Sequence, residues 1–132
     1  MKYWFIIGAV LSVTACKQPN EPLKERIASA DSVAVNYYSG DGTMDTVVAV
    51  RIIRNKQQIA DLAMHISEET VKRNFKCGLD GSLHFFKMNK VIQDVDFRMG
   101  DKDCMYFTFM QLGKLEATQL SPAAKTLIES LK

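Results

Sequence analysis

The chain has 132 residues, with 17 Lys or Arg against 15 Asp or Glu, which leaves a formal net charge of +2 at neutral pH. This length suits one modest domain with a single hydrophobic core. The near balance of charge argues against a nucleic-acid-binding protein, because such proteins carry a clear basic excess or a basic stripe. We therefore expect no nucleic-acid partner.

The start of the chain has the organisation of an export signal. Lys2 supplies a small positive region, and the apolar run at residues 3–11 is too short to cross a bilayer as a permanent helix. Small residues follow, and Cys16 comes directly after Ala15. This ending resembles the lipobox of bacterial lipoproteins, with Val13 where that family usually has Leu.

The resemblance implies that residues 1–15 are a lipoprotein signal peptide that is removed, and that Cys16 carries a diacylglyceryl group. In this family the new amino terminus is often acylated as well, and two or three acyl chains give stable anchoring where one gives only marginal binding. The resemblance also implies delivery to the outer membrane, facing the periplasm or the cell surface, because Lys17 rather than Asp follows the cysteine. The alternative is an ordinary signal peptide with a chance cysteine.

The chain has three cysteines, and an odd cysteine in an exported protein needs an explanation. If Cys16 carries lipid, Cys77 and Cys104 remain as a pair in an oxidising compartment, where disulfides persist. A redox-active pair is the alternative. Redox enzymes usually place their two cysteines in a Cys-x-x-Cys motif at a helix start, however, so we predict a structural disulfide.

Residues 16–30 are polar and contain Pro19 and Pro22, so we expect a tether here, with at most a short helix near residues 24–30. A single domain then spans residues 31–132. Residues 31–38 alternate in polarity, and residues 45–53 are nearly continuously apolar and β-branched. With the glycine-containing turn between them, they predict a β-hairpin whose second strand is central in its sheet.

Two amphipathic helices are expected in the domain. Asn55 is predicted to cap a helix with Ile59, Leu62, Ala63 and Ile66 on one face, and Ser121–Pro122 is predicted to begin a helix at the carboxyl end. Further strands are expected at residues 73–77, 83–88, 91–99, 104–110 and 114–120. The predicted fold is therefore α+β, an antiparallel meander sheet with two helices packed on one face.

The acidic residues of one predicted strand and its turn are weak candidates for a calcium site. Asp94 and Asp96 share a strand face, and Asp101 follows in the turn. Arg98 lies on the same face, and the spacing is not that of an EF-hand loop. The alternative is a solvent-facing row on an amphipathic strand. That strand would turn inward the side chains of Val91, Gln93, Val95 and Phe97.

Other site chemistry finds little support. His65 and His84 are the only histidines, which is too few for a zinc site without further ligands. The chain contains no nucleophile elbow and no phosphate-binding loop. We therefore expect no metal, no cofactor and no catalytic residue, and the sequence favours a protein that is not an enzyme.

Adjacent aromatic residues give the one functional hint in the domain. The pairs Phe85–Phe86 and Tyr106–Phe107 place aromatic rings on both faces of the sheet, and helices can cover only one face. Phe86 and Tyr106 would then point to the uncovered face, and exposed aromatic patches often mark binding surfaces. The alternatives are that the tether or a loop covers them, or that the sheet curls.

The sequence thus indicates a lipid-anchored cell-envelope protein, held at the membrane through its amino-terminal lipid. Its most economical role is a non-catalytic module that binds another envelope protein. The alternative is a periplasmic lipoprotein that binds a small ligand or calcium.

Overall fold

The structure is a computed structural model that describes residues 19–39, 46–72 and 77–132. The predicted signal peptide, the lipidation site at Cys16 and the first residues of the predicted tether lie outside the described residues. So do most of the predicted turn after residue 39 and most of the strand predicted at residues 73–77.

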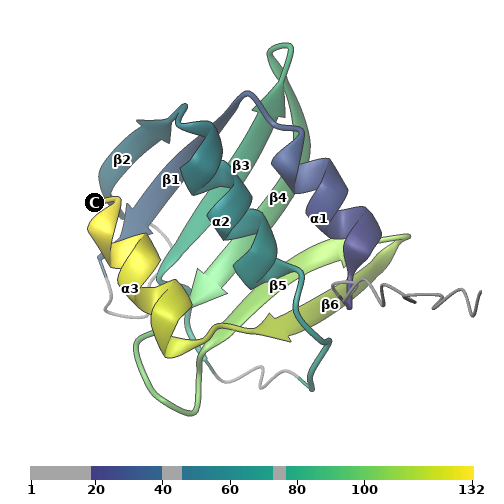
Figure 1. The fold of residues 1–132 in the computed structure, drawn as a ribbon. Coiled ribbons are helices and arrows are strands. Elements are labelled where there is room, and N and C mark those ends of the chain that lie inside the picture. The colour runs from purple at the N-terminus through teal and green to yellow at the C-terminus, as the bar shows by residue number, and fades with distance from the viewer. Residues whose placement is uncertain (1–18, 40–45, 73–76) are drawn as a thin grey trace, which may run out of the picture.

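The described residues form helices on one side of a single sheet (Figure 1). In chain order the elements are α1 (Glu21–Ala28), β1 (Ser32–Tyr38), β2 (Val47–Ile53), α2 (Lys56–Ile66), β3 (Gly81–Lys87), β4 (Lys90–Arg98), β5 (Tyr106–Gln111), β6 (Lys114–Gln119) and α3 (Pro122–Ser130). The six strands pair antiparallel in the order β2-β1-β3-β4-β5-β6. The fold is α+β with an antiparallel meander sheet, as predicted.

The core lies between the sheet and the helical layer. In Figure 1, α2 crosses the middle of the sheet, with α1 on one side of it and α3 on the other. Alternate side chains of β1, β3, β4 and β5 point into this layer, which follows from the period of two along a strand. The largest fully buried side chains include Leu23, Ile27, Ile59, Leu62, Leu83, Phe85, Phe97, Phe107 and Ile128.

The expectation of a tether over residues 16–30 is wrong for the residues of α1. Leu23 and Ile27 are completely buried, and the backbone amide of Asn20 donates to the carbonyl of Ser67 at the end of α2. Pro22 does not oppose this helix, because it sits in the first turn, where a missing amide costs no hydrogen bond. The folded domain therefore begins before residue 31, and three helices cover the sheet instead of two.

The two predicted helix starts are confirmed. The Asn55 side chain accepts a hydrogen bond from the Gln58 amide at 3.0 Å, which caps α2. The Ser121 hydroxyl accepts from the Ala124 amide at 3.1 Å, which caps α3 ahead of its proline. Both caps satisfy amides that have no partner inside the helix.

The prediction that residues 45–53 form a central strand is wrong, because β2 pairs only with β1 and lies at an edge of the sheet. A nearly continuous apolar run is typical of strands buried on both faces. Here, however, the helices leave much of β2 uncovered, and Val50 and Ile52 are about half exposed.

The predicted inward direction of one β4 side chain is also wrong. Gln93, Val95 and Phe97 face the core as predicted, but Val91 is 49% exposed. The register of β3 and β4 shifts between Phe85 and Phe86, which sets Val91 opposite Phe86 on the other face. Such an irregularity inserts one residue and reverses the alternation of the side chains beyond it.

Candidate functional site

The candidate site is the sheet face that looks away from the helices, which we call the open face. The cross-strand registers decide which of its side chains are neighbours. The side chains that reach this face from β1, β3, β4 and β5 include Asn36, Tyr38, Ser82, His84, Phe86, Val91, Asp94, Asp96, Arg98, Tyr106 and Thr108.

A chain of hydrogen bonds crosses the middle of the open face. His84 Nδ1 lies 2.6 Å from Asp94 Oδ1, and His84 Nε2 lies 3.1 Å from Ser82 Oγ. Asn36 Nδ2 and the Tyr38 hydroxyl both donate to Ser82 Oγ, each at 3.3 Å. These four hydrogen bonds are compatible with one another when His84 carries its proton on Nδ1 and its Nε2 accepts from the Ser82 hydroxyl.

Sequence reasoning missed this arrangement, although a local signal for it exists. Ser82 and His84 are two residues apart on one strand, so they share a face. The β3–β4 turn has positive φ at Met88 and Asn89, the pattern of a two-residue hairpin loop. Such a turn by itself would place Gln93 opposite His84, and the register shift between Phe85 and Phe86 brings Asp94 there instead.

The order Ser–His–Asp is that of a nucleophilic triad, which is recognised by geometry and not by position in the chain. Two features argue against that chemistry here. Ser82 is only 2% exposed, and its oxygen already accepts two hydrogen bonds. Residues 81–86 of β3 are also paired on both sides, so their amides serve the sheet and not a developing oxyanion. The chain of hydrogen bonds therefore fixes the shape of the face.

Arg98 and Asp96 lie beside this chain of hydrogen bonds, and together with it they form what we call the polar row. Arg98 Nη1 donates to Thr108 Oγ1 at 2.8 Å, and Arg98 Nε donates to the Cys77 carbonyl at 3.1 Å. Burial raises the pKa of Asp96 above the ordinary aspartate value; the charge of Arg98 opposes this rise, and that of Asp94 adds to it. The row therefore presents both charge signs within a few side chains.

A cleft opens on this face where β4 and β5 separate. Only the pairs from Asp96–Thr108 to Arg98–Tyr106 join the two strands. Beyond them, Gln93 crosses the gap, because its Nε2 donates to the Met110 carbonyl at 3.3 Å. The cleft has a volume of about 340 Å³, and its lining comprises Val91, Ile92, Gln93, Asp94, Asp96, Thr108, Phe109, Met110 and Leu115. Its lining thus combines two carboxylates, those of Asp94 and Asp96, with apolar side chains.

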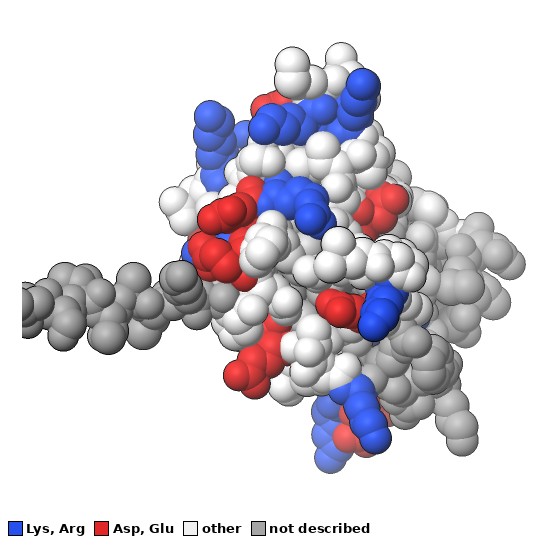
Figure 2. Space-filling view, turned by 90° about the vertical axis from the view of Figure 1, so that its right-hand side faces the viewer, with Lys and Arg blue, Asp and Glu red and all other residues white. Residues whose placement is uncertain are grey.

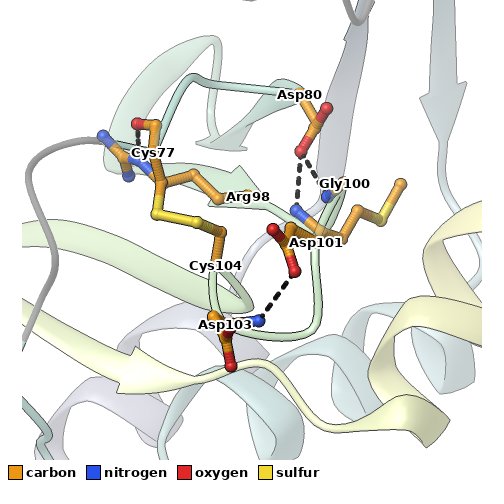
Figure 3. Close-up of a disulfide and its surroundings, with 8 residues drawn as sticks. Cys77, Asp80, Arg98, Gly100, Asp101, Asp103 and Cys104 are labelled. Atoms are coloured by element: carbon orange, nitrogen blue, oxygen red, sulfur yellow. Dashed lines mark hydrogen bonds between the residues drawn. A yellow bond between two sulfur atoms is a disulfide. The ribbon is translucent and has the colours of Figure 1, made fainter.

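The predicted disulfide is present and joins the entry of β3 to the entry of β5 (Figure 3). The Cα atoms of Cys77 and Cys104 lie 5.7 Å apart, within the usual range for a bridge. Arg98 reaches the Cys77 carbonyl from β4, so the bridge, β4 and the polar row are mechanically connected (Figure 3). The disulfide therefore supports one end of the open face.

The three calcium candidates do not converge. Asp94 and Asp96 line the cleft, whereas Asp101 lies in the loop beside the disulfide, where its Oδ1 accepts from the Asp103 amide at 3.2 Å (Figure 3). Asp80, which directly precedes β3, accepts on its Oδ2 from the backbone amides of Met99 and Gly100 at the start of that loop. Among the described residues, no group of three or more His, Cys, Asp or Glu could hold a metal ion.

The two aromatic candidates lie at opposite ends of the open face. Phe86 is opposite Val91, next to the β3–β4 turn, whereas Tyr106 is opposite Arg98 at the start of β5. Both are partly exposed, and the polar row lies between them. They do not form one aromatic patch, so the face combines a polar centre with two less polar ends.

A neighbouring side of the molecule carries mixed charge. Figure 2 shows Lys and Arg side chains interspersed with Asp and Glu on the side of the molecule at the right of Figure 1. In the described ranges, no helix is long and apolar enough to cross a membrane.

No protein-family model, curated protein or solved structure matches the chain. The class is therefore defined by the fold alone: within the described residues, an α+β domain of three helices and six strands with a disulfide and one sheet face that no helix covers.

Proposed function

We propose that the protein is a lipid-anchored cell-envelope protein, held through Cys16 at the outer membrane, that binds another envelope protein without catalysis. The open face carries this proposal, because none of the described helices covers it and an uncovered sheet face often marks a binding surface. The lipobox resemblance supports the anchor, and the disulfide suits a chain that works in an oxidising compartment.

The open face has the layout of a polar interface with apolar margins. Its central side chains are already held by one another, so binding would cost little side-chain ordering. At the margins, Val91 and Met110 are 49% and 54% exposed and present apolar area beside the cleft. A partner of complementary shape would bury these margins and pair with the fixed charges of the row.

Crosslinking in intact cells tests the binding role, with the full-length chain carrying a carboxyl-terminal tag. Phe86→Ser and Tyr106→Ser each alter one end of the open face, and Met64→Ser is the control because Met64 is 50% exposed on α2 in the other layer. We expect one dominant envelope protein whose capture falls with either open-face variant and not with the control. Equal capture by all folded variants would contradict the proposal.

The anchor is tested separately. Cys16→Ser should move the protein from the membrane fraction to the soluble fraction and leave its signal peptide uncleaved, since lipidation precedes cleavage in the family it resembles. Cys16→Ala serves as a second substitution without a hydroxyl. Unchanged fractionation and unchanged mass of the variants would refute the anchor.

The cleft supports a second candidate function, the binding of a small ligand. Its volume of about 340 Å³ falls within the range of small-molecule sites, and it combines apolar walls with a few polar groups. Small apolar molecules, and calcium at millimolar concentration, should then raise the melting temperature. Met110→Trp, which places a larger side chain in the lining of the cleft, should abolish this rise in melting temperature. No shift with any of these additions would exclude this second function.

A further inference from the structure

The two edges of the sheet differ in whether another described segment pairs with them. At the β6 edge, Thr70 forms an isolated bridge with Thr118, and the Val71 amide donates to the Ala117 carbonyl at 2.8 Å. The segment after α2 therefore covers part of that edge. At the other edge, β2 pairs with β1 alone, and no described segment pairs with its outer side.

The composition of β2 makes this difference notable. Val47, Val48, Val50 and Ile52 are 47–53% exposed. The strand contains no proline, and Arg51 is its only charged residue. Natural sheets usually protect an edge with charges, prolines, bulges or a covering segment, because free strand edges pair with other chains.

We propose that β2 is a strand-addition site, at which an extended segment of the partner protein pairs with its free edge. This proposal rests on the proposed protein-binding function and names the part of the partner that is bound. In such complexes, main-chain hydrogen bonds supply affinity and alternate side chains supply specificity. The added strand would continue the open face beside Val50 and Ile52, which lie opposite Asn36 and Ala34 of β1.

The charges at this edge select the segment. Arg51 lies within β2 and Arg54 directly after it, and Lys132 stacks over the Tyr37 ring at 5.4 Å, close to the contact of Arg51 with the Lys132 carbonyl. A partner strand with apolar residues at alternate positions and an Asp or Glu opposite Arg51 would complement this edge. Opposite charges directly across a strand pair are favourable, and like charges are unfavourable.

The same charges disfavour a second copy of this chain as the occupant. Consider two β2 strands that pair antiparallel with their helical layers on the same side of the joint sheet. In a register centred on Arg51 the two arginines are directly opposite, and in one centred on Val50 they are diagonal neighbours. Both registers, which pair most of the strand, therefore bring like charges together.

Three synthetic peptides test the proposal on the mature chain purified from membranes. The first is an acetylated seven-residue peptide of alternating Val and Thr with a central Glu. The second carries Lys at the centre. The third keeps the Glu but has alternate amides N-methylated, which blocks pairing along one edge. Fluorescence anisotropy reports binding, and hydrogen exchange of the β2 amides reports the location.

We expect the Glu peptide to bind at least tenfold more tightly than either of the others and to slow exchange in β2. Arg51→Glu should reverse the preference between the Glu and Lys peptides, whereas Lys114→Glu on β6 should leave it unchanged. If the charge reversal impairs folding, Arg51→Ala should erase the preference instead. Val50→Lys, which places a charge on the edge, should abolish binding of all peptides.

Equal binding of the N-methylated peptide, or binding of none at millimolar concentration, would overturn the proposal. A wild-type dimer in sedimentation that dissociates in Val50→Lys would assign the edge to a second copy and also overturn it. The outcome is separable from that of the proposed function. Capture of an envelope protein without peptide binding leaves that function standing, while peptide binding without a captured partner leaves only the edge competent.

Discussion

Gly81→Ala is expected to destabilise the domain severely, because a Cβ atom at this position has no room. It would lie 2.2 Å from the Asn36 carbonyl oxygen and 2.2 Å from Phe97 Cζ. The oxygen belongs to the β1 backbone, which is paired with β3 at this point, so it cannot withdraw without breaking the pairing. Phe97 would have to move in addition.

The cost follows from that displacement. Phe97 is fully buried and packs edge-on against Tyr37, with ring centroids 6.2 Å apart. Overpacking a core costs about 1–3 kcal/mol. Partial loss of a buried aromatic ring adds up to about 1.5–3 kcal/mol. Replacing glycine also lowers the entropy of the unfolded chain, which offsets the loss of stability by about 0.4–1 kcal/mol. We therefore expect a loss of about 2–5 kcal/mol, a large share of the total stability of a typical domain.

Urea unfolding of the oxidised mature domain, followed by far-ultraviolet circular dichroism, measures this loss; the only tryptophan is Trp4, within the predicted signal peptide. Gly100→Ala is the matched control, because a Cβ there would lie 3.4 Å from Asp80 Oδ1 in ordinary contact. The control should change stability by less than about 0.5 kcal/mol. A loss below about 1 kcal/mol for Gly81→Ala would refute this account of the β1–β3–β4 packing.

Further measurements address the disulfide, the polar row and the core. Replacing both Cys77 and Cys104 by Ser should lower stability by at most about 3–4 kcal/mol, since the bridge closes a loop with a sequence separation of 27; two reactive thiols in the native wild type would contradict the bridge. Because the raised pKa of Asp96 makes the folded state bind more protons above the ordinary aspartate value, ionisation of this carboxyl lowers stability as pH rises. Asp96→Asn should therefore be more stable than wild type at pH 7 and equally stable below about pH 3.5, and a variant less stable at pH 7 would reverse this sign. Ser82 should resist labelling by fluorophosphonates, and its modification would revive a nucleophilic role. Tyr37→Phe should cost about 1–3 kcal/mol, because it leaves an α3 carbonyl without its buried hydroxyl donor; an unchanged unfolding midpoint would show that this bond contributes nothing.

Local features of the fold were predictable because their causes lie within a few residues. Asn55 and Ser121 cap helices through their own neighbours, and the apolar spacing of each helix points to one face. Strand alternation likewise explains why His84 lies on the face opposite Leu83 and Phe85. The disulfide followed from counting cysteines once Cys16 was set aside as the predicted lipidation site.

The candidate site was predicted only in part. That Phe86 and Tyr106 reach the open face follows from alternation, but their separation by the polar row depends on the registers of three strands. The contacts of His84 with Ser82 and Asp94 depend on the turn at residues 88–89 together with the register shift between Phe85 and Phe86, and the strand pattern alone does not reveal that shift.

The sequence by itself determined the α+β class, the capped helices and the inward sides of most strands, because these depend on local propensity and periodicity. Tertiary structure alone decided that α1 joins the core, that β2 lies at an edge and that β4 and β5 part to form the cleft. Each of these depends on which surfaces far apart in the chain come to lie side by side, and an apolar run such as β2 carries no mark of which neighbour it will have.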